Sequence, residues 1–196
     1  MSLNFEENFI KKCKKGDKKA LEELYKKTSQ ILLGVCLRYT KNIHDAEDVF
    51  HEGFIKIIKK INLVNDTNKI MSWMIRIMVN TSINFLKKNK NLSESEFDEN
   101  YFDNNNKEYL EMRKEGEEEL LINLISEKDL YKFINELPNG YRIILNLFAI
   151  EGYSHKEIAA MLGISTSTSK TQYQKAKNKL KQKIEKYLSS KKENKI

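Results

Sequence analysis

The sequence is poor in residues that make turns, with one proline, Pro138, and seven glycines among 196 residues. A many-stranded sheet needs frequent tight turns, and such turns depend on these two residue types. The shortage therefore argues against a sheet of this kind and favours helices. Cysteine is equally scarce, since only Cys13 and Cys36 are present. Two cysteines make no disulfide framework, so we expect a reducing compartment.

Long apolar runs and secretion signals are missing as well. No apolar run approaches the roughly 18 residues that cross a bilayer, and the N-terminus has no basic stretch followed by an apolar one. We therefore expect a cytoplasmic protein without direct membrane insertion. There is also no glycine-rich phosphate loop and no cluster of cysteines and histidines at metal-ligand spacing. These absences predict no cofactor, no metal, no small-molecule substrate and no enzymatic activity.

Positive charge is plentiful, with a net charge of +7 and a pI near 9.1. Such an excess suits a polyanionic partner such as nucleic acid. The charge is unevenly placed: residues 1–90 carry +8, residues 91–126 carry −8 and residues 127–196 carry +7. The acidic stretch between the basic blocks has the composition of a solvated linker. The alternative is that it mimics nucleic acid and occupies a basic channel on a partner.

Apolar residues in both basic blocks recur at the three-and-four spacing of amphipathic helices. No alternating strand pattern competes with this spacing. The predicted fold is all-α, with two small helical domains at residues 8–90 and 127–188, an acidic linker at 91–126 and a basic tail at 189–196. The predicted helices begin after the N-cap Asp17 and near Asp45, and cover residues 70–88, 129–136, 141–151, 154–162 and 166–188.

The segment from Tyr153 to Ser165 has the pattern of a helix-turn-helix. Ser154 and Glu157 are spaced as a capping box, which starts a short helix. Gly163 falls where the chain must turn with positive φ, a conformation that glycine adopts without strain. Small hydroxyl residues and then lysines follow, as in a helix that enters the major groove. A plain helical hairpin without a ligand is the alternative.

Several motifs carry a family resemblance. In the second block they are Leu137–Arg142, Glu151–Ala159, Leu162–Ser165 and Lys175–Lys177, and in the first block Gly16–Tyr25, Asp45–Lys56 and Ser72–Asn80. They resemble the extracytoplasmic-function (ECF) group of bacterial sigma factors, in the sigma-70-like family, over residues 8–90 and 128–188. The resemblance implies a sigma region 2 bundle and a sigma region 4 helix-turn-helix. It also implies a transcription initiation factor that directs RNA polymerase core to promoters, recognises the −10 and −35 elements and promotes DNA melting.

The resemblance implies that the helix from about Asp45 docks on a coiled coil of the polymerase clamp. The expected polymerase-binding residues are Asp45, Glu47, Asp48, Glu52 and Lys56. An alternative reason for these acids is that carboxylates are stabilised at the N-terminus of a helix. This explains the residues from Asp45 to Asp48, but not Glu52, which lies one turn further along the helix. The polymerase flap and an anti-sigma factor are further partners that the resemblance implies.

The helix over residues 70–88 and the loop before it would meet the −10 element, where the family captures a flipped-out base. Asparagine pairs with base edges, and lysine neutralises phosphates. The ring of Trp73 could stack on an unpaired base, but we expect it to pack in the core of the domain. The expected −10 contacts are Asn65, Arg76, Asn80, Asn84, Lys87 and Lys88.

The second helix of the helix-turn-helix would read the −35 element as duplex DNA. Two departures from the family pattern matter here: Ser169 replaces an apolar residue, which predicts weaker packing, and Gln172 stands where arginine is common. His155 is expected to be solvated or close to phosphate. The expected −35 contacts are Ser165, Thr166, Thr168, Lys170, Thr171, Gln172, Lys175 and Lys177.

Three other classes of protein compete with this interpretation. A stand-alone helix-turn-helix regulator would need a dimerisation surface or a receiver-type sheet, and the first block shows neither. A nuclease would need Lys or His arranged with the acids near Asp45, and no such arrangement is present. A membrane-surface helix protein is disfavoured because the basic helices also carry core-facing stripes.

Overall fold

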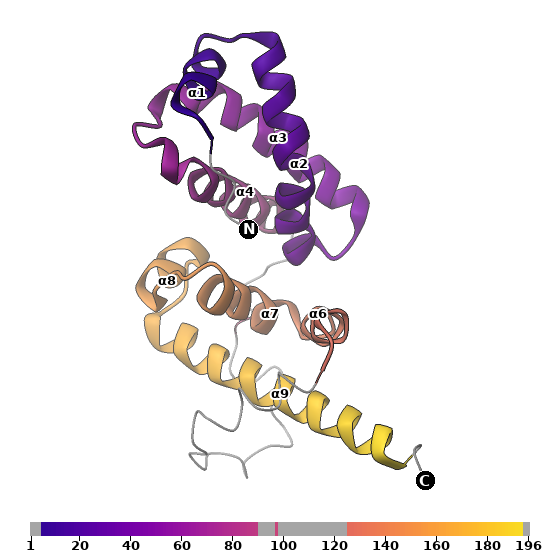
Figure 1. Cartoon of the computed structure of the whole chain (residues 1–196). Helices are drawn as coiled ribbons and strands as arrows, with labels where there is room; N and C mark the ends of the chain where they lie inside the picture. Colours follow the sequence, from indigo (N-terminus) through magenta and orange to yellow (C-terminus); the bar gives the residue numbers. More distant parts are fainter. Residues whose placement is uncertain (1–4, 90–96, 98–124, 194–196) are drawn as a thin grey trace. The chain divides into compact units, whose positions relative to one another are not determined.

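All secondary structure in the computed structural model, which describes residues 5–89, 97 and 125–193, is helical. No strand occurs in these ranges, and the prediction of an all-α fold is confirmed. The chain divides into two compact units, Met1–Asn89 and Lys90–Ile196 (Figure 1). Within the described ranges, every helix is too short or too polar to span a membrane.

The first unit is a bundle in which three long helices each contact the other two, with a short helix against the first of them. Two 3-10 turns connect the last two long helices. The elements are α1 (Glu7–Lys14), α2 (Lys18–Thr40), α3 (Ile43–Lys60), η1 (Ile61–Leu63), η2 (Thr67–Lys69) and α4 (Ile70–Lys88).

Polar caps set where α2 and α3 begin. The predicted N-cap of α2 is confirmed, since the Asp17 carboxylate accepts a hydrogen bond from the Ala20 N–H at 2.9 Å. α3 begins two residues before the predicted start, because the Asn42 side chain accepts from the Asp45 N–H at 2.9 Å. Lys41 between them is left-handed, with a φ of 71°. A left-handed residue followed directly by an N-cap turns the chain from α2 into α3 within two residues.

Apolar side chains from the three long helices form the core of the first unit. α3 and α4 come close at Gly53, where a Cβ atom would lie 2.4 Å from Sδ of Met78. Each fully buried side chain of this size contributes about 1.5–3 kcal/mol, so the bundle is a firm platform for the polar residues on its outside. The fully buried members include Leu24, Leu32, Tyr39, Ile57, Met74 and Met78.

The second unit is built along one long helix, α9, against which α6, α7 and α8 pack (Figure 1). Its core joins α6 and α7 to the middle of α9 through Phe133, Leu137, Tyr141, Ala176 and Leu180, among others. The elements are α6 (Glu127–Asn135), α7 (Asn139–Leu145), a π-helical turn η4 (Asn146–Ile150), α8 (His155–Leu162) and α9 (Thr166–Glu193).

The single helix predicted over residues 141–151 differs from what the structure contains. α7 starts at Asn139, directly after Pro138, and widens into the π-helical turn, in which the Glu151 N–H donates to the Asn146 carbonyl at 3.0 Å. Gly152 follows with a φ of 75° and redirects the chain towards α8. The periodicity of apolar residues does not distinguish an α-helical from a π-helical turn, so this change could not be predicted from the sequence.

Candidate nucleic-acid and polymerase interfaces

The helix-turn-helix predicted from the sequence is present in α8, the turn at Gly163 and α9. The Ser154 hydroxyl and the Glu157 carboxylate form the expected capping box at the start of α8. Gly163 is left-handed, with φ 76° and ψ 31°, and its N–H donates to the Ala159 carbonyl at 2.9 Å. The hydroxyl of Ser165 then accepts from the Thr168 N–H at 2.9 Å and so caps the start of α9.

A polar and aromatic contact joins α8 to α9 behind this turn. The Ser169 hydroxyl is fully buried and lies 2.9 Å from Nδ1 of His155, whose ring stacks on Phe148 at 4.2 Å between centroids. Ser169 therefore forms a hydrogen bond to His155 at a position where related proteins have an apolar side chain that packs in the core. Burial, and secondarily the charge of Lys170, lowers the pKa of His155. His155, which is half-buried, thus joins α8 to α9.

Most of the predicted −35 residues lie on the accessible part of α9. Ser165, Thr166 and Lys170 are exposed, and Thr168, Thr171, Lys175 and Lys177 are half-buried. Gln172 differs, because its side chain is fully buried and its Nε2 donates to the backbone carbonyl of Phe97 at 3.0 Å. The Gln172 amide is therefore not available to a base edge in this conformation.

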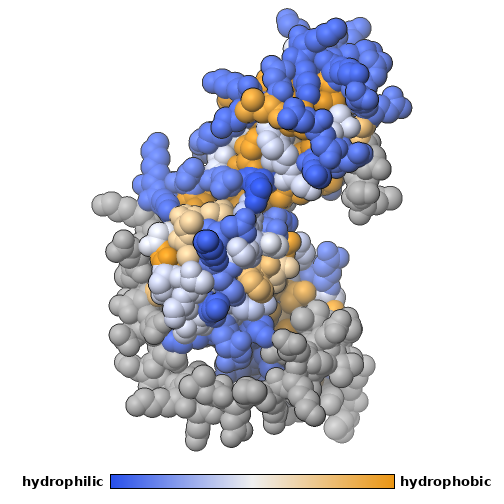
Figure 2. Space-filling view, turned by 90° about the vertical axis from the view of Figure 1, so that its left-hand side faces the viewer, coloured by the Kyte–Doolittle hydropathy of each residue, from blue (hydrophilic) through white to orange (hydrophobic). Residues whose placement is uncertain are grey.

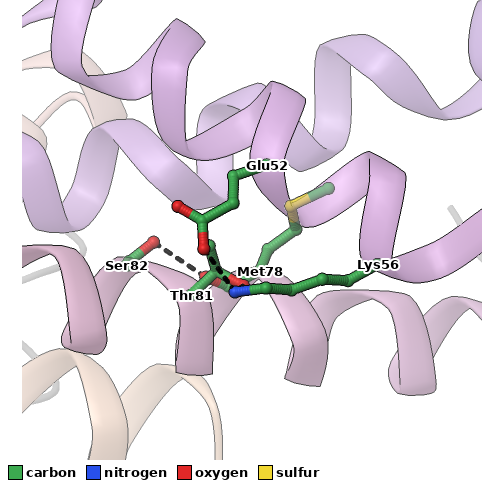
Figure 3. A network of polar contacts seen from close by, with 5 residues as sticks. All are labelled: Glu52, Lys56, Met78, Thr81 and Ser82. Atoms are coloured by element: carbon green, nitrogen blue, oxygen red, sulfur yellow. Dashed lines mark hydrogen bonds and ion pairs between the residues drawn. The ribbon is translucent and has the colours of Figure 1, made fainter.

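Four of the predicted polymerase-binding residues, Asp45, Asp48, Glu52 and Lys56, follow one another at three- or four-residue spacing along α3, whereas Glu47 lies on another part of its surface. Glu47, Asp48 and Glu52 are exposed, and Asp45 and Lys56 are half-buried. Figure 3 shows the amine of Lys56 between the Glu52 carboxylate, at 2.5 Å, and the Thr81 hydroxyl of α4, at 3.3 Å. Exposed ion pairs contribute little stability, so this contact mainly fixes how the two side chains lie.

Exposed apolar residues on α3 were missed because the sequence interpretation selected residues by charge. Ile55 is 54% exposed and follows Asp48 and Glu52 at helical spacing, so it extends the acidic stripe with an apolar contact. Ile58, one turn beyond Ile55, is 39% exposed as well. An apolar residue is expected to be buried by default, and only the structure shows the exceptions. Figure 2 shows that apolar patches occur between hydrophilic residues on the face in view.

The predicted −10 residues form an exposed row on α4. Arg76, Asn80 and Asn84 recur every four residues, and Lys87 and Lys88 end the same helix; all five are exposed. The Asn80 amide donates to the Arg76 carbonyl at 2.9 Å, which sets the direction of that side chain.

The loop before α4 presents Asn65, which is exposed as expected. Lys14 holds this loop on the bundle, because its amine donates to the Val64 carbonyl at 2.5 Å. Leu63, which is 70% exposed in the same loop, was not selected from the sequence. Trp73 is half-buried rather than part of the core.

An apolar groove of about 300 Å³ lies on the second unit between α6, the π-helical turn and α9. Ile150 at this groove is 45% exposed, and two lysines border the apolar lining. Four elements, α6, α7, the π-helical turn and α9, contribute to it, so no local pattern indicates it. The lining residues are Leu130, Ile134, Leu145, Ala149, Ile150, Tyr173, Lys177, Leu180, Lys181 and Ile184.

The acids on α3 do not gather into a metal site. Among the residues that the structure describes, no group of three or more His, Cys, Asp or Glu side chains is placed to hold a metal ion. The arrangement on α3 is an acidic stripe along a helix, which suits a protein partner.

Comparisons with known proteins match both units. The family model described as Sigma-70 region 2 matches residues 24–92, and that described as Sigma-70, region 4 matches residues 127–180. The chain is 29% identical over 163 residues to RNA polymerase sigma factor SigV of Bacillus subtilis (strain 168), covering 77% of this chain and 90% of the relative. It is 26% identical over 183 residues to ECF RNA polymerase sigma factor SigW of the same strain, covering 89% and 94%. A solved structure of the sigma factor RpoE in complex with the anti-sigma factor NepR from Bartonella quintana has a TM-score of 0.48 and 18% identity, covering 84% of this chain and 96% of that chain.

The two family models match in the order region 2, region 4, and the relatives match along most of their length. The resemblance seen in the sequence motifs is thereby confirmed, and a stand-alone regulator is not favoured. The chain belongs to the sigma-70-like family as an ECF sigma factor, a transcription initiation factor that directs RNA polymerase core to promoters.

Proposed function

We propose that three helices divide the work of initiation: α3 docks on the polymerase clamp, α4 with its preceding loop engages the −10 element, and α9 reads the −35 element. The observation that carries this proposal is the start of α9. There a capped helix presents hydroxyl groups and lysines on its accessible side while its opposite side is held against α7 and α8. Such a helix meets the requirements for insertion in a major groove.

The acidic stripe of α3 is suited to a basic protein partner. Exposed Glu47, Asp48 and Glu52 supply charge that steers association, and exposed Ile55 supplies apolar area at the same surface. The Glu52–Lys56–Thr81 contact links this surface to α4. Docking of α3 would therefore orient the DNA-facing helix as well.

The exposed row on α4 combines two chemistries. Asn80 and Asn84 have amides that pair with base edges, whereas Lys87 and Lys88 neutralise phosphates at the end of the helix. Asn65 and Leu63 project from the adjoining loop, which provides a polar and an apolar group for an unstacked base. Trapping of unpaired bases here would drive melting without nucleotide hydrolysis.

Each unit alone offers a small interface, and the tether between them adds effective concentration at two promoter elements. The apolar groove on the second unit is our candidate binding site for the polymerase flap or an anti-sigma factor, because an amphipathic helix with acidic flanks fits apolar walls bordered by lysines.

We assign the protein a binding role with no reaction of its own. Its proposed location is the cytoplasm, where the polymerase and the chromosome are.

Lys170→Glu tests the role of α9. Footprinting of a holoenzyme–promoter complex should show loss of protection at the −35 element, and the slope of log affinity against log salt should fall by about 1 per lost phosphate contact. Lys186→Glu is the matched control, since it reverses the same charge on an exposed part of α9 outside the predicted contacts. Equal −35 protection by the two variants would contradict the assignment.

Asp48→Lys tests the docking role of α3. Pull-down of polymerase core by this variant should be strongly reduced, because a like charge would face the basic partner. Glu22→Lys, an exposed charge reversal on α2, should retain the core. If Asp48→Lys retained polymerase core as well as the wild type does, the proposal that α3 forms the polymerase interface would be wrong.

A further inference from the structure

A polar and aromatic cluster holds the start of α8 against the DNA-facing part of α9. His155 is the first residue of α8, and its Nδ1 lies 2.9 Å from the hydroxyl of Ser169. The same ring stacks on Phe148 of η4, with 4.2 Å between the centroids and 15° between the ring planes. The ring of Tyr173 completes the cluster, 5.8 Å from that of His155 and 4.5 Å from that of Phe148. Three elements therefore meet at one imidazole.

The two contacts on α9 set the rotation of that helix about its own axis. Ser169 and Tyr173 are four residues apart, so they lie on the same side of α9, one turn from each other. Thr168 and Lys170 are the sequence neighbours of Ser169, and both are proposed −35 contacts. A rotation of α9 that broke the contact with His155 would therefore also displace the side chains that read DNA.

Ser169 and His155 form a matched polar pair. The Ser169 side chain is fully buried, and a buried hydroxyl that lacks a hydrogen-bond partner is costly. The imidazole supplies that partner from α8. Loss of either residue leaves the other with an unmet hydrogen-bonding group, whereas two apolar groups of similar shape would need no hydrogen bond at all.

The surroundings of His155 favour the neutral ring. Its place at the first position of α8 exposes it to the partial positive charge of a helix N-terminus, which disfavours a cation. Burial, and secondarily the charge of Lys170 on α9, lowers the pKa of His155. A protonated ring would meet positive charge from both helices that it joins. Protonation therefore works against the contact between α8 and α9.

The other charged and titratable groups around the ring do not offset this effect. From α9, Tyr173 faces the ring and has the amine of Lys177 over it at 5.8 Å. The residue of η4 that faces the ring, Phe148, carries no charge. On α8 itself, Lys156 adds positive charge, and the Glu157 carboxylate already accepts hydrogen bonds from the backbone and hydroxyl of Ser154, at 2.9 and 2.8 Å.

We propose that neutral His155 is a positioning residue for the −35 element: through Ser169 and Tyr173 it fixes the rotation of α9, and protonation of the ring loosens that contact and lowers discrimination between −35 sequences. In this role His155 touches no base and acts only through α9. The inference rests on the proposed role of α9 in reading the −35 element.

Loss of alignment should lower discrimination and leave general affinity unchanged. A single misread base pair costs about tenfold in affinity, whereas phosphate contacts hold any sequence. The quantity to measure is therefore a ratio of two affinities. One is for a promoter found by start-site mapping with this protein, and the other is for the same duplex with its −35 element scrambled.

The first measurement is this ratio for the holoenzyme, formed from polymerase core and the full chain, as a function of pH. NMR of the ring protons in the full chain gives the pH interval over which His155 protonates. The ratio should fall about tenfold over that interval in the wild type. His155→Gln, which cannot titrate, should give a ratio independent of pH, and His44→Gln, at an exposed histidine of the first unit, should follow the wild type.

Three results of this measurement would overturn the proposal. The first is a wild-type ratio that stays constant while the ring protonates. The second is the same pH dependence in His155→Gln as in the wild type. The third is a ratio that rises on protonation, which would make His155 a contact to phosphate.

The second measurement exchanges the polar pair at pH 7.5. Ser169→Ala removes the partner of the ring and should lower the ratio. His155→Phe combined with Ser169→Val replaces the pair by apolar groups and keeps a ring against Phe148, so it should restore the ratio and abolish its pH dependence. Circular dichroism checks that each variant is folded. A folded double variant that kept the wild-type pH dependence would refute the role of His155.

Lys170→Glu separates this inference from the role of α9 on which it rests. Suppose that Lys170→Glu removes protection of the −35 element while the wild-type ratio is independent of pH. The positioning role of His155 then fails and the role of α9 stands. If Lys170→Glu leaves −35 protection intact, the role of α9 itself fails.

Discussion

The turn of the helix-turn-helix should tolerate only glycine at position 163 without loss of stability. Gly163 is left-handed, with a φ of 76°, and a Cβ atom added there would meet nothing within 4 Å. The whole cost of Gly163→Ala is therefore the backbone conformation, about 1–2 kcal/mol for an L-residue in this region. Alanine also restricts the unfolded chain, which offsets about 0.4–1 kcal/mol of that cost. We expect a net loss of about 1 kcal/mol.

Gly34→Ala is the matched control with the opposite sign. Gly34 lies inside α2, has an ordinary helical φ, and likewise has nothing within 4 Å of an added Cβ atom. The same substitution should therefore stabilise the first unit by about 0.5–1 kcal/mol. Gly163→Asn should be milder than Gly163→Ala, because asparagine visits the left-handed region more readily.

Urea unfolding measures both effects when two signals are compared. Trp73 is the only tryptophan and belongs to the first unit, so its fluorescence follows that unit, whereas far-UV circular dichroism follows both. Gly163→Ala should lower the dichroism midpoint and leave the fluorescence midpoint unchanged; Gly34→Ala should raise the fluorescence midpoint. An unchanged or raised dichroism midpoint in Gly163→Ala would refute the reasoning about the turn.

Three further predictions concern single side chains. Burial lowers the pKa of His155 below its ordinary 6.5, so the stability of the second unit should be complete above pH 6.5 and fall as the pH drops towards the lowered pKa; urea midpoints at pH 7.5 and 5.5 should differ, and His155→Gln should reduce the difference. Burial raises the pKa of Cys36 to about 12 and also raises that of Cys13, so iodoacetamide at pH 8 should label them only after unfolding, as a mass shift would show. Ser126 caps α6 by accepting from the Asp129 N–H, and Ser126→Ala should cost about 1 kcal/mol in urea unfolding.

Local signals in the sequence were sufficient for the helices and for the turn at Gly163. The cap at Asp17, the capping box at Ser154 and the bounds of α4 each depend on residues within one or two turns, and all three agree with the structure. Two local features were not recognised. The start of α3 is set by the Asn42 cap three residues before Asp45, and the π-helical turn after α7 leaves no mark on the spacing of apolar residues.

Local and long-range contacts differ in the same way at the candidate interfaces. The exposed row on α4 follows from helical spacing alone, and the structure places all its members at the surface. The side-chain amide of Gln172 donates to the carbonyl of Phe97, which lies far away in the sequence and in a stretch with the composition of a linker. Ser169 seemed to weaken the packing of α9, yet His155 from α8 provides its partner. Polar pairs of this kind leave no periodic pattern in the sequence.

Transcription from sheared genomic DNA by polymerase core, with and without the purified protein, tests the central claim most directly. With the protein, 5′-end mapping should give discrete start sites that share two upstream sequence elements at a fixed separation, and Lys170→Glu should weaken the use of those sites. Start sites that are the same with and without the protein would contradict its assignment as the factor that directs polymerase to promoters.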